Sequence, residues 1–364
     1  EVVMLPIPKA SIKGHQPLQM SQLRPISILQ EMSRLTSALL SQRLAKVFQS
    51  NPSWIDSAQS GFLKGRSILD AITSVTTVLE HSNQSARENK EGKSAERQHA
   101  YVASYDQAAA YDTVQEFTVR MSLKRFSMPN ALIDFIMSCV TGASAYVSSP
   151  AGSTKTFKLS TGVRQGDPLS PLVFVLVADA MHAGLRNNPL TNTSDGYRVG
   201  EEAIASAAYA DDFTVISGTM EGLARMHRWV CEFLKFHKMK LNVSKSFFTS
   251  TSSSPALSLG DSENAINRKA TDVAWRHLGI SITASLTWTS QIKSSECTVM
   301  EVITKGKAHN LTTRQRSLML TTYLYGRLDL SLCTVPIPTL TLTKLDRYIR
   351  SFILDSTTVL FRSS

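Results

Sequence analysis

A mixed α+β fold is predicted for this chain of 364 residues, because segments of helical and of strand-like periodicity follow one another along it. Apolar residues recur at helical spacing over 33–48 and over 222–236. Residues 101–105 have the composition of a buried strand. Two further strand-like segments, 204–209 and 213–217, enclose a pair of acids, which is typical of a tight hairpin with acids at its tip.

The same patterns predict the remaining elements. Helices are predicted over 67–81, 114–126, 130–140 and 169–185. A strand is predicted over 2–8, a hairpin turn at 150–152, and a strand pair near Phe247 and Leu278–Ile280 that closes the sheet. The polar stretches 82–98 and 250–255 are predicted to be loops.

Composition narrows the class of protein. A hydrophobic fraction of 42% is enough for a large core in two or three subdomains. The net charge of +10 favours a polyanionic partner, although an ordinary basic protein is the alternative. The four cysteines lie far apart, which argues against disulfides or a zinc site and favours a reducing compartment. No apolar run is long enough to span a membrane, so no membrane partner is expected.

Three acids stand out by their context. Asp106 follows a predicted strand, and Asp211 and Asp212 lie at the predicted hairpin tip. Neighbouring strand ends would bring these carboxylates together, and their repulsion would then favour a bound cation. Mg²⁺ suits carboxylate and phosphate oxygens, and a pair of such ions supports in-line phosphoryl transfer. The alternative is a solvated hairpin turn.

Several motifs, in a fixed order, resemble those of reverse transcriptases. The segment Tyr209-Ala210-Asp211-Asp212 resembles their catalytic hairpin, and Asp106–Asp112 (DQAAAYD) resembles their first metal-binding motif. The Gln-Gly loop of the family is matched almost letter for letter by Gly162–Pro171 (GVRQGDPLSP). Shorter matches follow and precede these three: Leu241–Lys245, His277–Ile280, Ile7–Lys9, Arg24–Ser27 and Gln59–Phe62. The resemblance covers about residues 2–283 and is nearest to retrotransposons without long terminal repeats, then to group II introns.

The resemblance implies a right-hand polymerase fold. Fingers are expected over 1–100 with part of 113–160, a palm over 101–288, and a helical basic thumb over 289–364. It implies an RNA-directed DNA polymerase that binds an RNA template, a DNA primer and deoxynucleoside triphosphates (dNTPs), within a retrotransposon polyprotein. The opening at Glu1 in strand-like sequence supports a piece cut from something longer. The chain is expected to be intracellular and nuclear.

The resemblance also implies roles at the metal site. Asp106 and Asp211 would bind two Mg²⁺ ions, for which Mn²⁺ could substitute, and Asp212 would support them. The backbone carbonyl of Gln107 would complete one coordination shell. Lys245 would protonate the leaving pyrophosphate, with a solvated lysine as the alternative.

Further roles concern the nucleotide. Lys9 and Arg24 would bind the triphosphate, or be ordinary surface cations. Tyr111 would stack beneath the sugar and exclude a 2′-hydroxyl, with a core aromatic as the alternative. Gln165 would contact the sugar, and Gly166 would let the backbone pass close to it.

In the C-terminal region, Gly279 belongs to the segment that resembles a primer grip. From 289 to 364 there are ten Lys and Arg against five Asp and Glu. Four of these cations, Lys305, Lys307, Arg314 and Arg316, are expected to follow the nucleic-acid backbone. The alternative is a solvated helical face.

Two departures from the family pattern matter. Lys238-Met239 stand where the family usually has glycine and a hydrophobic residue, and Gln107 with two alanines replaces commoner small polar and basic residues. The segment has no sequence typical of an endonuclease, a Cys/His knuckle or an RNase H. Two alternatives to a retrotransposon polymerase are an inactive domesticated scaffold that binds RNA, and an intron maturase or other cellular reverse transcriptase.

Overall fold

The structure, a computed structural model, describes residues 2–8, 23–90, 98–150, 152–187, 195–252, 257–261 and 263–354. The chain divides into two compact units, Glu1–Lys269 and Ala270–Ser364, and each is described by itself. Within the described residues no helix is long and apolar enough to cross a membrane.

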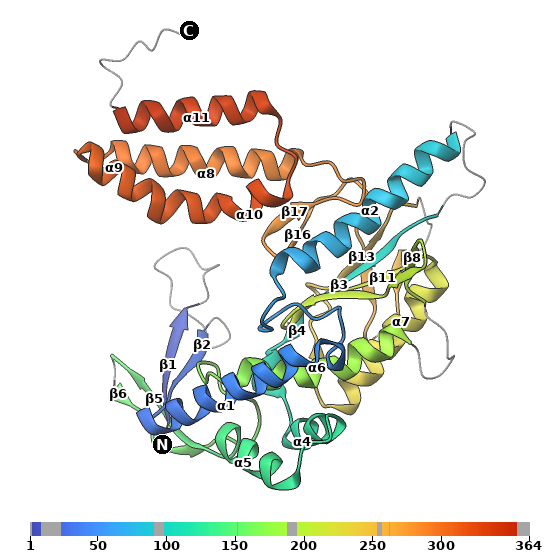
Figure 1. The fold of residues 1–364 in the computed structure, drawn as a ribbon, viewed down its shortest axis with the longest axis vertical. Coiled ribbons are helices and arrows are strands. Elements are labelled where there is room, and N and C mark those ends of the chain that lie inside the picture. The colour runs from blue at the N-terminus through green and yellow to red at the C-terminus, as the bar shows by residue number, and fades with distance from the viewer. Residues whose placement is uncertain are drawn as a thin grey trace. The chain divides into compact units, whose positions relative to one another are not determined.

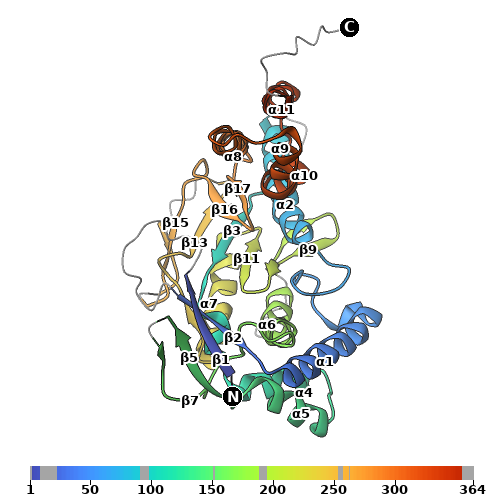
Figure 2. The ribbon, with the colours of Figure 1, turned by 90° about the vertical axis from the view of Figure 1, so that its left-hand side faces the viewer.

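A six-stranded, mostly antiparallel sheet organises the first unit (Figure 1). Strand β3 lies between β11 and β13, antiparallel to both, and the three strands run side by side in both views (Figure 2). The predicted strand at 101–105 and the predicted acid-tipped hairpin are therefore confirmed. In the order of the sheet the strands are β10 (Ser206–Tyr209), β11 (Asp212–Ser217), β3 (Tyr101–Tyr105), β13 (Phe247–Ser250), β15 (Ile266–Arg268) and β14 (Ser258–Leu259).

Two helices form most of the core beneath this sheet. Helix α6 (Ser170–Arg186) is apolar on nearly every side and is almost wholly buried, as expected for a helix surrounded by protein. Helix α7 (Met220–Phe236) is amphipathic and packs on β11, β3 and α6. The hydroxyl of Thr219 accepts a hydrogen bond from the Gly222 backbone N–H at 3.0 Å and so caps the start of α7.

A second sheet is built around β1 (Val2–Pro8). This strand pairs antiparallel with β2 and parallel with β5, so segments distant in sequence lie side by side. The remaining strands of the sheet are β2 (Leu23–Ile28), β5 (Ser144–Ser149), β6 (Gly152–Ser153) and β7 (Phe157–Lys158). Shorter elements of this unit are α3 (Ala110–Thr113), α4 (Glu116–Arg125), α5 (Asn130–Val140), the strand pair β4 (Gln107–Ala108) with β12 (Lys240–Leu241), the pair β8 (Tyr197–Val199) with β9 (Glu202–Ile204), and the 3₁₀ turn Pro52–Trp54.

Helix α1 (Glu31–Ser50) is present where the sequence predicts a helix, but its apolar face is not uniformly buried. Leu44 and Phe48 join the core, whereas Leu35 and Leu39 are 53% and 52% exposed. Apolar spacing indicates one face of a helix, and it cannot tell how far the partner surface extends along that face.

The predicted loop over 82–98 is wrong for its first half, because helix α2 (Ile68–Lys90) continues through it. Ser82 is buried, and its hydroxyl hydrogen-bonds the Gln98 carbonyl at 2.9 Å and the Thr251 hydroxyl at 2.6 Å. These tertiary bonds hold a polar stretch in helical form without an apolar period. Residues 91–97 lie outside the described part.

The second unit is a hairpin followed by helices. Among the described residues, strands β16 (Trp275–His277) and β17 (Ile280–Ile282) pair with each other and with no other strand, so the predicted closure of the central sheet by 278–280 is wrong. Both edges of β13 are already occupied, by β3 and β15. Val299, Ile303, Leu324 and Phe352 are central in the helical core. The helices are α8 (Thr289–Lys307), α9 (Thr313–Met319), a π-helical segment (Leu320–Tyr325), α10 (Gly326–Thr334) and α11 (Thr339–Leu354).

Candidate active site

Strand pairing brings the three predicted acids to one end of the central sheet. Phe213 pairs with Tyr105, and Asp106 follows Tyr105 directly. Tyr209 pairs with Asp212 across the β10–β11 hairpin, so its two-residue loop is Ala210–Asp211. All three carboxylates line one cleft of about 850 Å³.

The surroundings of Asp211 disfavour its negative charge. Burial raises the pKa of Asp211 above its usual value, and the charge of Asp106 raises it further. The backbone N–H of Asp211 itself and the guanidinium of Arg24 act in the opposite direction. Two carboxylates that line one cleft and repel each other favour the binding of a cation between them.

Asp106 is held by the segment that follows α7. Its Oδ2 accepts a hydrogen bond from Asn242 Nδ2 at 2.8 Å and lies 3.6 Å from the Lys245 ammonium. Its backbone N–H donates to the Ser246 hydroxyl at 3.1 Å, and its carbonyl accepts from the Asn242 N–H at 2.8 Å. The residue is thus fixed through both main chain and side chain.

The donor set fits a divalent metal ion shared with a substrate. Among the described residues, no three His, Cys, Asp or Glu side chains stand together as a complete metal cage. Mg²⁺ is commonly bound by one or two carboxylates, and water and substrate phosphates fill its other positions. The mutual repulsion of Asp106 and Asp211 is the property that such an ion relieves. Gln107 also lines the cleft, and its side-chain Oε1 is buried without a hydrogen-bond partner.

Tyr111 belongs partly to the core and partly to the cleft. Its ring stacks on Phe174 of α6, with centroids 4.8 Å apart and planes 14° apart. The residue also lines the cleft, where burial and then the charge of Asp211 raise the pKa of its hydroxyl. Tyr111 therefore packs on the core and also lines the cleft.

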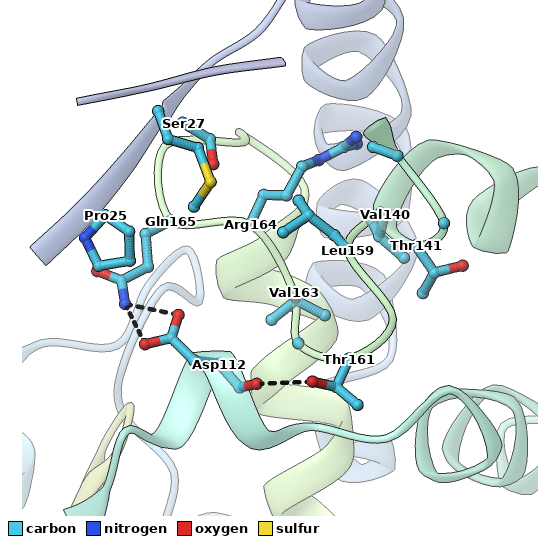
Figure 3. Close-up of a pocket in the computed structure, with 14 residues that line it drawn as sticks. Pro25, Ser27, Asp112, Val140, Thr141, Leu159, Thr161, Val163, Arg164 and Gln165 are labelled. Carbon is cyan, nitrogen blue, oxygen red and sulfur yellow. Dashed lines mark hydrogen bonds between the residues drawn. The ribbon is translucent and has the colours of Figure 1, made fainter. Parts of the chain in front are cut away.

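The side chain of Gln165 is held by Asp112, the last residue of the Asp106–Asp112 motif. Its Nε2 donates to both carboxylate oxygens of Asp112, at 3.0 and 3.2 Å (Figure 3). The Gln165 backbone carbonyl accepts from the Ser27 N–H at 2.7 Å. The next residue, Gly166, has φ +107°, and a Cβ there would lie 2.5 Å from the Ser27 carbonyl oxygen. Glycine is thus required by the close approach of β2.

A second hollow of about 340 Å³ adjoins the cleft and is shown in Figure 3. Pro25, Asp112, Arg164 and Gln165 line both spaces. Two polar atoms in its wall, Ser27 Oγ and Arg164 Nε, are buried without a hydrogen-bond partner. The wall therefore retains hydrogen-bonding capacity that protein groups do not use.

The remaining residues predicted to bind the nucleotide or its pyrophosphate are Arg24, Lys245 and Lys9. Arg24 lies on β2, is exposed and lines the cleft. Lys245, in the Leu241–Lys245 motif that follows α7, also lines the cleft. Lys9 lies outside the described residues.

The predicted nucleic-acid contacts all belong to the second unit. Gly279, with φ +96°, follows Leu278 in the β16–β17 turn. Lys307 and Arg314 are exposed, and Lys305 pairs with Glu301 at 2.7 Å.

Arg316 has a structural role that the sequence did not reveal. Its guanidinium donates to the carbonyls of Leu311 and Phe352, both at 3.0 Å, and lies over the Phe352 ring. Because the bond to Phe352 joins α9 to the end of α11, Arg316 stabilises the helical unit itself.

At 238–239, where the family usually has glycine and a hydrophobic residue, the backbone forms the turn with Lys238 and Met239. Lys238 adopts φ +55°, the left-handed conformation that usually selects glycine after a helix, and Met239 is buried. The turn is therefore made without glycine.

Three residues with evident functions lay within the quoted motifs, although the sequence suggested no role for them. Asn242 orients Asp106, Asp112 orients Gln165, and Gln59 contacts the loop that carries Asp211. Their position inside the motifs was the available signal.

Three carboxylates stand at one end of an antiparallel sheet and line a cleft that cations also line, an arrangement that defines the palm of a right-hand nucleic-acid polymerase. A family model described as reverse transcriptase (RNA-dependent DNA polymerase) matches residues 7–291. The chain belongs to the reverse transcriptase family, as its motifs predict.

Two curated relatives and one solved structure are similar to this chain. The Pol polyprotein of the type-2 retrotransposable element R2DM of Drosophila melanogaster is 30% identical over 272 residues, which cover 72% of this chain and 24% of that protein. The Pol polyprotein of the type-1 retrotransposable element R2 of Popillia japonica is 28% identical over 235 residues, covering 64% and 30%. Apo telomerase from Candida tropicalis is 12% identical with a TM-score of 0.51, over 92% of this chain and 60% of that one. These findings confirm the predicted retrotransposon type and the right-hand fold. The chain spans less than a third of either relative.

Proposed function

We propose that this chain extends the 3′-hydroxyl of a DNA primer on an RNA template, as the polymerase part of a longer retrotransposon polyprotein. The observation that carries the proposal is the pairing of Tyr105 with Phe213, which sets Asp106 and Asp211 against one cleft. Family membership supports RNA as the template and dNTPs as the substrates.

The carboxylates of Asp106, Asp211 and Asp212, with the backbone carbonyl of Gln107, would hold two Mg²⁺ ions, with Mn²⁺ as a substitute. When bound, such an ion pair lowers the pKa of the attacking hydroxyl and neutralises charge on the departing phosphate oxygens. The protein's own contribution is to keep two mutually repelling acids at fixed strand ends. Asn242 and Ser246 fix Asp106, so little rearrangement is needed when substrate arrives.

The remaining cleft residues position the nucleotide. Arg24, together with Lys9, binds the triphosphate by charge-assisted hydrogen bonds. Tyr111, supported from behind by Phe174, closes the space that a 2′-hydroxyl would need. Gln165 contacts the sugar while Asp112 holds its amide. Lys245 donates a proton to the leaving pyrophosphate.

The adjoining hollow is our candidate for the template nucleotide. It shares a wall with the cleft, and the unused Ser27 Oγ and Arg164 Nε can bond a polar ligand. By the same proposal, fingers span 1–100 with part of 113–160, a palm spans 101–288 and a thumb spans 289–364. Gly279 and the exposed cations Lys305, Lys307 and Arg314 then contact the primer–template backbone.

Primer extension with the purified chain tests the proposal. Labelled DNA primers on matched RNA and DNA templates are incubated with dNTPs and either Mg²⁺ or Mn²⁺, and product length is read on a gel. The expected result is metal-dependent extension on RNA. Binding of template–primer without extension under either metal would overturn the polymerase assignment and favour the RNA-binding scaffold.

A further inference from the structure

The segment 58–60 lies along the outer edge of the central sheet. Strand β10 is the last strand on this side, and Gln59 forms a parallel bridge with Ala208. The Ala208 N–H donates to the Ala58 carbonyl, and the Ser60 N–H donates to the Ala208 carbonyl, both at 2.8 Å. The segment therefore covers an edge that would otherwise be unpaired, close to the hairpin tip.

The Gln59 side chain reaches from this segment to the loop that carries Asp211. It is 0% exposed. Its Oε1 accepts the Ala210 N–H at 3.0 Å, and its Nε2 donates to the Ala210 carbonyl at 3.3 Å. One amide thus holds the peptide group before Ala210 and the one after it. The second of these peptide groups is bonded directly to the Cα of Asp211.

The loop needs such support. Ala210 has φ +60°, a left-handed conformation that costs an ordinary residue about 1–2 kcal/mol. The fit against the supporting segment is also close, since a Cβ on Gly61 would lie 2.5 Å from the Ala210 nitrogen. The Gly61 N–H donates to the same Gln59 oxygen at 3.0 Å, which aligns that oxygen with the loop.

Gln59 is itself anchored. The Arg66 guanidinium donates to the carbonyl of Gln59 at 2.7 Å and to that of Asp56 at 2.6 Å. The Asp56 N–H in turn donates to Oδ1 of the buried Asp179 on α6 at 2.6 Å. The amide that contacts Ala210 is therefore connected to the core helix through fixed main chain.

We propose that Gln59 is a positioning residue for the reaction, whose amide sets the orientation of the Ala210–Asp211 peptide group and so the place of the Asp211 carboxylate. The inference rests on the proposed polymerase function and assigns that site a further residue. Glutamine is suited to this because its side chain ends in both an acceptor and a donor.

Two substitutions separate hydrogen bonding from packing. Gln59→Met keeps the length and removes both bonds, so nucleotide incorporation should fall about 10²-fold, as for displacements of about 1 Å at reacting groups. Gln59→Glu keeps the acceptor, and only its protonated form also restores a donor. The ratio of its rate to the parent's should therefore rise as the pH is lowered.

A readout that needs neither metal nor turnover is amide hydrogen exchange. Loss of the acceptor in Gln59→Met should speed deuterium uptake at the Ala210 amide. Thr118→Val is the matched control, because it removes a buried hydrogen bond to His237 (2.9 Å) without altering any cleft residue. This control should keep the parent's rate and the parent's exchange at Ala210.

The outcomes are distinguishable. An active parent whose Gln59→Met variant keeps its rate and its Ala210 exchange would overturn the positioning role alone. If Gln59→Met has a thermal midpoint like that of Thr118→Val but a much lower rate of nucleotide incorporation, the result supports positioning over general destabilisation. A parent that extends no primer would overturn the positioning role and the polymerase assignment together.

Discussion

The Lys245 ammonium lies 3.6 Å from Oδ2 of Asp106, on the same oxygen that Asn242 holds at 2.8 Å. The side chains of Lys245 and Asp106 are 68% and 36% exposed, so their ion pair contributes little stability. Lys245 can therefore leave Asp106 for a phosphate at low cost.

Lys245→Ala should lower the rate of nucleotide incorporation by about 10²–10⁴-fold, because a proton donor to the leaving group is lost. Template–primer affinity should stay within about twofold of the parent, since one exposed cation contributes little. Rapid-quench kinetics measure the rate. Lys245→Arg is the control, because it keeps the charge but is a much weaker proton donor. If Lys245→Ala keeps the parent's rate, the residue is a solvated lysine.

Asp211→Asn should abolish extension and leave template–primer affinity nearly unchanged, because the substitution removes a ligand charge and hardly alters shape. The metal contributes several kcal/mol to such reactions, so the loss should exceed about 10³-fold. Activity is measured by primer extension and affinity by fluorescence anisotropy. A variant within about threefold of the parent would remove Asp211 from the metal site.

Tyr111→Ala should admit ribonucleotides, because it empties the space next to the sugar that the Tyr111 ring, stacked on Phe174, now fills. The measured quantity is the ratio of kcat/KM for deoxy- and ribonucleotides, which should fall at least about tenfold. Tyr111→Phe, which keeps the ring, is the control and should keep the ratio. A ratio unchanged in Tyr111→Ala would return the ring to a purely packing role.

Replacing Lys305, Lys307 and Arg314 with Gln should weaken template–primer binding and flatten its salt dependence. For every phosphate that a cation no longer neutralises, the negative slope of log K against log salt should decrease in magnitude by about 0.7–0.9. Arg316 is excluded from this set because it bonds the Phe352 carbonyl. Its own replacement by Gln should cost about 1–3 kcal/mol of stability. A triple variant with the parent's slope would make this face a solvated one.

Lys238→Gly should stabilise the protein by about 1 kcal/mol, because glycine adopts the left-handed conformation without strain. The Lys238 side chain is exposed, so little packing is lost. Chemical denaturation measures the change, with Lys235→Gly in the last turn of α7 as the control that should destabilise. Equal effects of both substitutions would contradict the strain at Lys238.

Much of the fold was predictable because its signals are local. The strand at 101–105 and the hairpin around Asp211 are short, apolar and bounded by polar residues, and the structure has both. The errors arose where distant contacts decide. Polar bonds of Ser82 continue α2 through a stretch without apolar period, and β15 occupies the edge of β13 that the 278–280 segment was expected to fill.

In the candidate site, too, local sequence signals were predictive and long-range contacts were not. Acids at strand ends and the ordered motifs indicated the residues that the structure gathers around one cleft. Gln59 could not be assigned, because its partner Ala210 is 151 positions away. Arg316 was expected to face nucleic acid, and its bond to Phe352 emerges only once α9 and α11 are packed. Residue type indicates chemistry, whereas long-range hydrogen bonding decides which groups are already engaged.

The central place of β3 has a consequence for the synthesis of the chain. Both of its strand partners lie far downstream, and the bond from Asp106 to Ser246 spans 140 positions. At translation rates of about 5–20 residues per second, an emerging β3 waits roughly 7 to 28 seconds for β13 to leave the ribosome. During that interval an apolar strand with at least one open edge is exposed to other nascent chains. Correct assembly of the catalytic end therefore depends on protecting β3 until its last neighbour has been made.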